Sequence, residues 1–297
     1  MLKISTKKRK KQDGLLAFAL LAIPMGWWII ISFFPLIFGF VLGFVDWPYL
    51  GASPTFAGFK NFAAFFTSEN YYMPLIRSFL IGGSSFILTT LLGFIVALCL
   101  NKISFLKGFF RTVWYIPVIT SGVAVTQIFN MLLDPFNGVI NNVLNAIFGM
   151  EPIIWMDSTR WSVFWILVYS VWKGVGGSAL LWLAGLQSLD KNMAEAAAVD
   201  GAGRFRTFFS VELPQLLYVL VFIVVTGFTG AMQIYEQVLF ISNGGPYGTT
   251  EVLAFRIMYD AFQENNFGMA GASSMVMTLV TFGVSCFAFK LQKEGVR

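Results

Sequence analysis

Long apolar runs alternate with short polar segments along the chain, and six of these runs are long enough to cross a bilayer. A helix needs about 20 mostly apolar residues to span the hydrocarbon core. The pattern therefore predicts an all-α integral membrane protein with six transmembrane helices. We expect the first span to kink or tilt around Pro24 and Pro35. The predicted spans are residues 15–42, 77–100, 112–133, 161–187, 214–241 and 268–290.

Basic residues gather on one set of the segments that flank these spans. They occupy the N-terminus, positions 102–111, positions 191–206 and the C-terminus. The opposite loops carry only Lys60, Arg77, Arg160 and Arg256. Because Lys and Arg mark the cytoplasmic side, both termini and the loop 189–214 are predicted to be cytoplasmic. The chain then divides into a basic N-terminus (1–14), a transmembrane domain (15–291) and a C-terminus (292–297).

The basic N-terminus permits other interpretations. It imitates the start of a signal peptide, but the apolar run 15–45 is too long and has no small-residue cleavage site. A basic cluster could also bind nucleic acid or anionic lipid. Directly beside a span it is typical of a topology anchor in contact with membrane lipid, so we expect no nucleic-acid partner.

Composition narrows the function classes. Hydrophobic residues make up 57% of the chain, charged residues 12%, and the mean hydropathy is +0.73, which excludes a soluble globular protein. The chain has no histidine, the commonest general base and metal ligand, so we expect neither a catalytic residue nor a metal site. Cys99 and Cys286 lie inside apolar runs and do not indicate a disulfide framework.

One polar segment between two spans, 195–214, is patterned as structure. Residues 194–198 have high helix propensity and little side-chain bulk. Asn192 is the expected N-cap, with Glu195 closing a capping box. Gly201 and Gly203 would end this helix, because glycine adopts the left-handed conformation cheaply.

A second short helix is expected over 204–210, with Phe205, Phe208 and Phe209 largely on one side. Pro214 suits the first turn of the next span, where its missing N–H is no loss. The segment is therefore predicted to be a small, smooth knuckle on the cytoplasmic face.

The spacing Glu-Ala-Ala, three residues, Gly, nine residues, then aliphatic-x-Leu-Pro resembles the EAA loop of membrane subunits of binding-protein-dependent ABC importers. Valine replaces the commoner isoleucine at the aliphatic position. A second group of motifs resembles the maltose-type sugar branch, and within it the first of the two dissimilar membrane subunits. The positions of the first motif are Glu195, Ala196, Ala197, Gly201, Val211, Leu213 and Pro214. Those of the second are Asn243-Gly244-Gly245-Pro246, Thr249-Thr250, Tyr259-Asp-Ala-Phe262 and Phe267-Gly268.

The resemblance implies the permease fold of a type I ABC importer in the bacterial cytoplasmic (inner) membrane, with an oligosaccharide or related polyol as substrate. It implies four kinds of partner: a second homologous permease subunit, an ATPase dimer, an extracytoplasmic solute-binding protein and the sugar. The chain lacks the Gly-x4-Gly-Lys-Ser/Thr phosphate loop. We therefore expect no cofactor in this chain, with ATP and Mg bound by the partner ATPase.

In the family the cytoplasmic loop lies in a groove of the ATPase. Transferred here, Glu195 is the ion-pair contact, the alanines form the packing face and Gly201 is the hinge. Alternatively, Glu195 only caps its own helix and Gly201 only ends it. The expected docking set is Glu195, Ala196, Ala197, Ala198, Asp200, Gly201, Leu213 and Pro214.

Two charges fall inside spans, Lys173 and Glu236. Because a charge in lipid is costly, each is a candidate for the translocation path, although a salt bridge between them is a feasible structural alternative. The resemblance places positions matching Gly174, Gly177, Gly227, Gly230 and Ala231 around the membrane sugar site. Close helix packing is the other explanation for such small residues. The remaining candidates to bind a sugar are Gln233, Tyr235, Gln127 and Asn130.

The outer loops are predicted to carry short interfacial helices within 46–70 and 135–160, and a turn over 243–250. Two other functions stay open. One is an ABC importer of a phosphorylated or charged solute, for which Lys173 would be the counter-charge. The other is an ion-coupled secondary transporter that uses Lys173 and Glu236. Import itself follows only from the resemblance.

Overall fold

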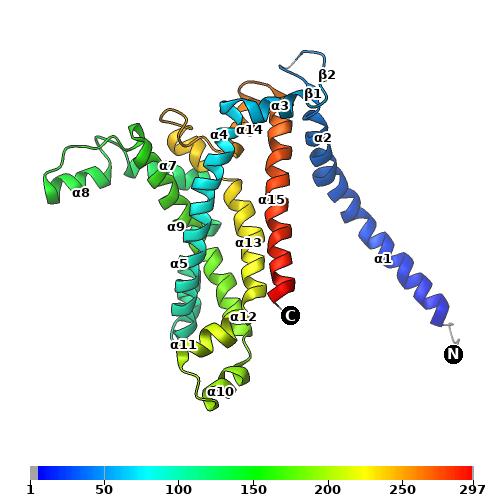
Figure 1. Ribbon diagram of the computed structural model, residues 1–297, viewed down its shortest axis with the longest axis vertical. Helices are drawn as coiled ribbons and strands as arrows, with labels where there is room; N and C mark the ends of the chain where they lie inside the picture. The colour runs from blue at the N-terminus through cyan, green and yellow to red at the C-terminus, as the bar shows by residue number, and fades with distance from the viewer. Residues whose placement is uncertain (1–5, 50, 296–297) are drawn as a thin grey trace.

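The computed structural model describes residues 6–49 and 51–295, and this part of the chain is helical apart from one two-stranded hairpin (Figure 1). The first elements are α1 (Thr6–Trp28), η1 (Ile29–Phe33), α2 (Phe34–Leu42), β1 (Val45–Asp46), β2 (Thr55–Phe56), α3 (Lys60–Thr67), α4 (Glu69–Arg77), η2 (Ser78–Gly82), α5 (Gly83–Lys102), α6 (Lys107–Ile119), α7 (Gly122–Leu132) and α8 (Val139–Phe148). The others are η3 (Trp155–Asp157), α9 (Thr159–Ser188), α10 (Lys191–Val199), α11 (Arg204–Thr207), η4 (Phe208–Glu212), α12 (Leu213–Gln215), α13 (Leu217–Met232), η5 (Val238–Ser242), α14 (Leu253–Phe262) and α15 (Phe267–Gly295).

Within the described residues, four helical stretches are long and apolar enough to cross a membrane, and two bent helix pairs bring the number to six if each pair is one span. The prediction of a six-span all-α membrane protein is therefore confirmed, with the first, second, fourth and sixth spans close to their predicted positions. The four long stretches are Leu16–Leu42, Glu69–Lys102, Thr159–Ser188 and Phe267–Lys293.

The predicted third and fifth spans are not continuous helices. The third bends by 90° between α6 and α7, because Thr120 and Ser121, shortly after Pro117, have ψ of 142° and 127° and are not helical. In the fifth, the segment Arg204–Gln215 meets α13 at 59°. The helix then stops at Met232 rather than at the predicted residue 241, and helical structure resumes at Glu236 and continues into η5.

The core lies where α5 packs along α9, and α13 runs beside these two helices (Figure 1). Trp182 is 5% exposed, and its Nε1 donates a hydrogen bond of 3.1 Å to the Thr90 carbonyl. At Gly176 the backbone touches the carbonyl of Trp114, so a β-carbon there would overlap that oxygen. Small residues thus bring the helices into close contact, as expected where lipid supplies no hydrophobic drive between them.

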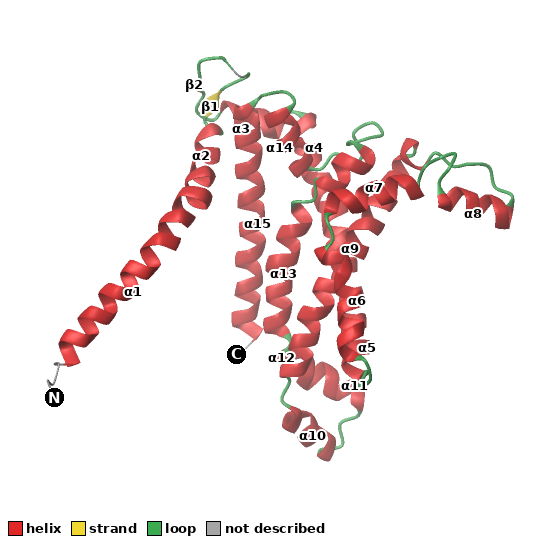
Figure 2. Cartoon of the chain, turned by 180° about the vertical axis from the view of Figure 1, so that it is seen from behind, coloured by secondary structure: helices red, strands yellow, loops and turns green. Residues whose placement is uncertain are grey.

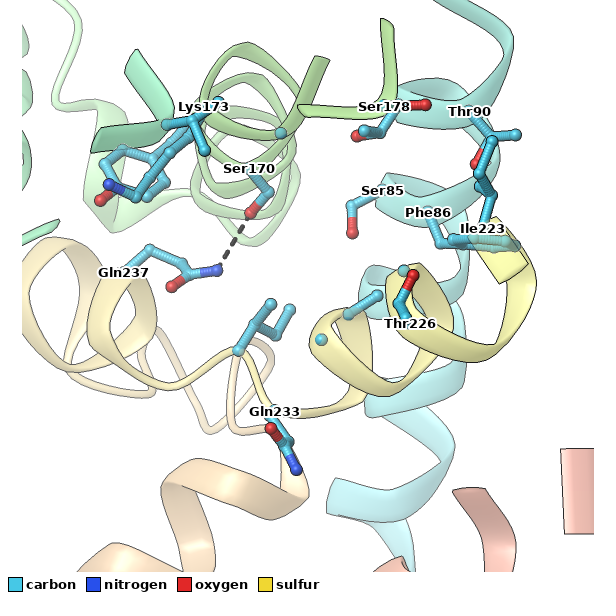
Figure 3. A pocket seen from close by; sticks show the side chains of 18 of the residues that line it. Ser85, Phe86, Thr90, Ser170, Lys173, Ser178, Ile223, Thr226, Gln233 and Gln237 are labelled. Atoms are coloured by element: carbon cyan, nitrogen blue, oxygen red, sulfur yellow. Dashed lines mark hydrogen bonds between the residues drawn. The ribbon is translucent and has the colours of Figure 1, made fainter. Parts of the chain in front are cut away.

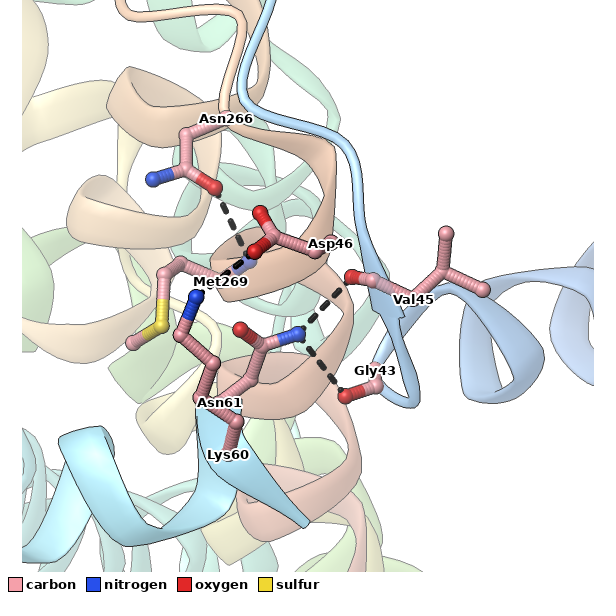
Figure 4. A network of polar contacts seen from close by, with 7 residues as sticks. All are labelled: Gly43, Val45, Asp46, Lys60, Asn61, Asn266 and Met269. Carbon is pink, nitrogen blue, oxygen red and sulfur yellow. Dashed lines mark hydrogen bonds and ion pairs between the residues drawn. The ribbon is translucent and has the colours of Figure 1, made fainter. Parts of the chain in front are cut away.

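The first span stands apart from the bundle and joins it only near its outer end (Figure 2). The apolar stretch within Leu16–Leu42 has no buried residue. A π-helical turn, η1, precedes Pro35 at the start of α2, which agrees with the predicted irregularity there. At the junction, Asn61 Nδ2 donates to the carbonyls of Gly43 and Val45, at 3.1 and 2.8 Å (Figure 4).

The outer loops differ in part from the prediction. The short helix predicted within 46–70 is present as α3, but the sequence reasoning missed the hairpin β1–β2 before it and the start of α4 after it. Lys60 closes this region through an ion pair of 2.7 Å with Asp46. The helix expected within 135–160 is α8, which projects sideways from the bundle (Figure 1). The predicted turn at 243–250 is present, with left-handed backbone at Asn243.

Described parts of both chain ends lie toward the same end of the bundle as α10 (Figure 1). The arrangement agrees with the prediction that both termini share the side of the polar loop. The helix of the first span begins at Thr6, earlier than the predicted residue 15. Residues 1–5 of the predicted basic N-terminus, Lys3 among them, and residues 296–297 of the predicted C-terminus lie outside the described residues.

Candidate functional site

A cavity of about 460 Å³ opens among the helices of the bundle (Figure 3). Its wall comes from α5, α6, α9, α13 and the segment that follows α13. This volume lies within the range of small-molecule sites. The lining residues are Ser85, Phe86, Thr89, Thr90, Val118, Tyr169, Ser170, Lys173, Gly174, Ser178, Leu181, Ile223, Thr226, Gly227, Gly230, Ala231 and residues 233–237.

Most of the predicted path residues lie in this wall. Three do not: Gly177 lies next to Val118, Gln127 is exposed on α7, and Asn130 donates a 2.7 Å hydrogen bond to the Phe240 carbonyl. Asn130 therefore ties α7 to η5. The predicted residues that line the cavity are Lys173, Gly174, Gly227, Gly230, Ala231, Gln233, Tyr235 and Glu236.

The glycines in the wall have two different roles. A β-carbon at Gly174 would lie 2.9 Å from Thr89 Cγ2, and one at Gly227 would lie 3.0 Å from Phe86 Cε2. These two glycines allow α9 and α13 to pack closely on α5, which agrees with the alternative explanation that small residues serve helix packing. A β-carbon at Gly230 would meet no atom of the described residues within 4 Å, so the missing side chain leaves open space there.

Several polar groups in the wall could meet a ligand. Gln237 is 8% exposed and its Nε2 donates to Ser170 Oγ at 3.1 Å, which leaves the amide oxygen for another donor (Figure 3). Among the described residues, Ser178 Oγ is buried without a hydrogen-bond partner. By contrast, the hydroxyls of Ser85 and Thr226 donate to carbonyls of their own helices.

The salt bridge considered between Lys173 and Glu236 does not form in the described part of the chain. Lys173 Nζ instead donates to the carbonyl oxygens of Thr120, at 2.7 Å, and Pro117, at 3.5 Å. The Glu236 carboxylate lies against Gly122, where a β-carbon would overlap it. The two charges thus face different sides of the break between α6 and α7.

Sequence reasoning missed the contribution of α5. Ser85 and Thr89, four residues apart, place polar atoms on one face of an otherwise apolar span. The spacing is a signal for a helix face that does not contact lipid. Ser170 and Gln237 were missed because their bond joins residues 67 positions apart.

At the end of the bundle that is predicted to be cytoplasmic, α10 and α11 form the predicted bent pair and protrude beyond the bundle (Figure 1). The expected cap is wrong by two residues: Asp190 is the N-cap, and its Oδ1 accepts a 2.9 Å bond from the Asn192 amide. Asp and Asn cap equally well, so propensity alone did not choose between them. With the helix starting at Lys191, Glu195 is too far along for a capping box.

Gly201 ends α10 as predicted, with φ of +77°. The Ala202 amide donates to the Ala197 carbonyl at 2.9 Å and the Gly201 amide to the Ala198 carbonyl at 3.1 Å, which is the Schellman pattern. Gly203 differs from the prediction, because its φ is −65° and it is the N-cap of α11.

The loop presents its predicted docking residues to solvent. Glu195, Ala196, Ala198, Asp200 and Gly201 are exposed. Ala197 and Leu213 are half-buried, and Pro214 is exposed within α12. Large apolar side chains are also exposed here: Val199 (88%), Phe205 (81%), Phe209 (54%) and Met193 (50%). An exposed apolar group at the polar end of a membrane protein is typical of a protein–protein contact.

Short links join this loop to the cavity helices. Only Leu189 and Asp190 separate α9 from α10, and the Asp190 amide donates to Gln215 Oε1 of α12 at 3.3 Å. Phe208 packs on Phe94 of α5, with ring centroids 6.1 Å apart. The same helices, α9 and α13, therefore carry both the loop and the cavity wall.

An acidic ring surrounds Arg256 on α14, at the opposite end of the bundle. Its guanidinium lies 2.7 Å from Asp260, 3.1 Å from Glu264 and 3.5 Å from Glu251. Burial raises the pKa of Asp260 to about 7, against the lowering effect of Arg256. Burial lowers the pKa of Arg256, but Asp260, Tyr71 and Glu264 together outweigh burial and raise it. All four charged residues belong to α14 or the segments beside it, and none lines the cavity. Arg256 also lies over the ring of Tyr71 on α4, 5.0 Å from its centroid.

Comparison with characterised sequences places the whole chain among transport proteins. The permease protein YurN of Bacillus subtilis, described as a probable ABC transporter permease, is 28% identical over 93% of this chain and 96% of its own. MsmF of Streptococcus mutans, a multiple sugar-binding transport system permease, is 27% identical over 96% and 98%. UgpA of Agrobacterium fabrum, from an sn-glycerol-3-phosphate transport system, is 24% identical over 83% and 84%.

Among solved structures, a bacterial ABC transporter involved in the import of the acidic polysaccharide alginate has the same fold. Its TM-score is 0.79 at 24% identity, over 97% of this chain and 98% of that one. A structure of the alginate transporter with its pentasaccharide-bound periplasmic protein matches with a TM-score of 0.77. Residues 89–292, more than half of the chain, match the family model of the binding-protein-dependent transport system inner membrane component. The chain is therefore a member of this family: a multi-pass permease subunit of an ABC transporter in the inner membrane, and not its ATPase.

Proposed function

We propose that this permease serves an importer of an oligosaccharide or related polyol, as the first of two dissimilar membrane subunits of the maltose-type branch. The observation that carries the proposal is the cavity of about 460 Å³ whose wall belongs to the helices that flank the docking loop. Amide and hydroxyl groups from Ser170, Ser178 and Gln237 suit the hydroxyls of a sugar. The sugar-transport relative and the alginate importer support the same substrate class.

The docking role is proposed for the exposed loop. Glu195 would pair with a basic residue of an ATPase, and Ala196, Ala197 and Ala198 would pack in its groove. Asp200 and Gly201 fix the end of α10, while Leu213 and Pro214 begin the path back into the membrane. Two ATPase copies, a second homologous permease and an extracytoplasmic solute-binding protein would complete the importer. The alginate transporter has a structure in complex with its pentasaccharide-bound periplasmic protein. ATP and Mg would bind to the ATPase.

Alternating access would follow from closure of the ATPase dimer. Two residues join α10 to α9, and α12 joins the loop to α13. When α10 moves, both sides of the cavity would therefore move with it. The cavity and the docking face are two separate sites joined by one moving element, which an allosteric claim requires.

A phosphorylated or charged solute is the second candidate, since UgpA belongs to a glycerol-3-phosphate system. Lys173 would then be the counter-charge. Its two hydrogen bonds to backbone carbonyls and the nearby Glu236 favour neutral cargo instead. Ion-coupled transport by Lys173 and Glu236 has no support from the family.

The cavity test uses Gly230, which faces open space. Gly230→Trp should fill the cavity and abolish uptake of labelled oligosaccharides by cells that express the complete transporter, while Gly230→Ala should transport. Gly283→Trp, at an exposed position of α15, is the size control. Normal uptake by assembled Gly230→Trp transporter would show that cargo does not pass through this cavity.

A further inference from the structure

The break in the third span leaves two helix ends inside the membrane region. The last carbonyls of α6 and the first amides of α7 lack partners within their own helices. The Ser121 side chain, at the N-cap of α7, makes no capping hydrogen bond. Such polar ends are tolerated at membrane depth only where protein or a polar cavity satisfies them.

The chain places a matching charge at each end. Lys173 donates to the carbonyls of Thr120 and Pro117, where the helix dipole of α6 is negative. Glu236 lies against Gly122, the first residue of α7, where the dipole is positive. Each charge thus has the sign that stabilises the helix end it meets.

A third side chain reaches the same break. Tyr169 is 1% exposed, and its hydroxyl donates to the Gly122 carbonyl at 3.1 Å. It stands one helical turn before Lys173 on α9, so two consecutive turns of one helix hold both sides of the break.

We propose that Tyr169, Lys173 and Glu236 form a clasp on this break. The clasp holds α6 and α7 at their angle, and the junction between them moves together with α9. The charges of Lys173 and Glu236 then act on the protein backbone rather than on cargo or coupling ions. Since α9 leads directly to α10, displacement of the docking loop reaches the junction through the clasp. The three side chains are positioning residues of the cavity wall, and the uptake readout below rests on the proposed transport function.

Spin labels at 109 and 131 measure the junction directly. Phe109 and Met131 are 60% and 74% exposed and stand equally far from Thr120. Two arms of about 16 Å at a right angle put these positions about 23 Å apart, against about 33 Å in a straight helix. The experiment uses the assembled transporter with Cys99 and Cys286 replaced by alanine.

Lys173→Met removes the donor at nearly constant volume, Lys173→Arg keeps it, and Lys102→Met at the exposed end of α5 is the matched control. We expect Lys173→Met to broaden the distribution of distances between the two labels toward the longer value. Lys173→Arg should keep the wild-type distribution. The maximal uptake rate of every accepted cargo should fall by about tenfold with KM unchanged, as expected when the charge-assisted hydrogen bonds of Lys173 are lost.

An unchanged distance distribution in Lys173→Met would overturn the proposal. So would a loss confined to anionic cargo with a raised KM, which would make Lys173 the counter-charge of the substrate. If Lys173→Met does not assemble, Tyr169→Phe and Glu236→Gln should each broaden the distribution, and no change in either would refute the clasp. Failure of the wild type to take up any sugar would contradict the proposed function, while the distances would still decide the clasp.

Discussion

The acidic ring on α14 predicts that this permease becomes less stable as the pH rises through neutrality. Asp260 is fully buried, and its Oδ1 lies 2.7 Å from Arg256 Nη2 without the alignment of a hydrogen bond. Burial is the largest influence on its carboxyl, and Glu264 and Glu251 add to it. Together they outweigh Arg256 and raise the pKa from 3.8 to about 7. The folded protein therefore holds this proton more tightly than the unfolded chain does.

The sign and size follow from proton linkage. A carboxyl whose pKa is raised by folding stabilises the fold fully below its unfolded pKa of 3.8, and this contribution is lost as the pH rises through about 7. Between pH 5 and pH 8 the loss is roughly 2–3 kcal/mol, at about 1.4 kcal/mol for each pH unit over which the proton is lost. The melting temperature should fall by roughly 5–10 °C over this interval.

The assay is thermal unfolding of the detergent-purified protein at pH 5 and pH 8. Wild type should lose stability as predicted, and Asp260→Asn should show little pH dependence. Glu264→Gln, whose side chain is 42% exposed in the same ring, is the matched control and should keep most of the dependence. A flat wild-type profile, together with an Asp260→Asn variant that is destabilised equally at both pH values, would show that Asp260 is charged throughout.

Two glycine pairs give further predictions. Gly176→Ala should destabilise the protein by about 1–3 kcal/mol because its β-carbon would overlap the Trp114 carbonyl. Gly177→Ala, which meets Val118 at an ordinary 3.9 Å, should change stability by less than about 0.5 kcal/mol; equal melting temperatures for the two variants would contradict the close contact of α6 and α9. Gly201→Ala should cost about 1–2 kcal/mol at its φ of +77° and reduce ATPase capture, whereas Gly203→Ala at −65° should do neither. Pull-down of the ATPase measures this pair, and indifference of capture to Gly201→Ala would argue against a fixed end for α10.

Hydropathy predicted the six spans well because lipid leaves the backbone few alternatives to a helix. The same window averages over the two non-helical residues Thr120 and Ser121, so it missed the right-angle bend between α6 and α7. Pro117 was the available signal, but proline in a membrane helix often only kinks it. Likewise, the fifth span was predicted too long because the apolar run continues after the helix has stopped at Met232.

The candidate site was predictable where a residue acts through its own helix. Gly201 ends α10 by local backbone geometry, and the sequence identified it. Lys173 and Glu236 were recognised as unusual because they lie in apolar runs. Their contacts could not be predicted, because Lys173 binds two backbone carbonyls, which any sequence could supply. The hydroxyl groups of α5 line the cavity only because α5 packs against helices far away in the sequence, so the local sequence did not predict them.

The most direct test of the central claim is capture of the ATPase by this permease when it is expressed with its genomic neighbours. Wild type should bring down an ATPase and a second membrane subunit in mild detergent. Glu195→Arg and Gly201→Asp should reduce the bound ATPase, while Glu151→Arg, an equal charge reversal at an exposed position beyond α8, should not. Equal ATPase in all four samples, or none in any, would contradict the assignment of α10 as the element that couples ATP hydrolysis to the cavity.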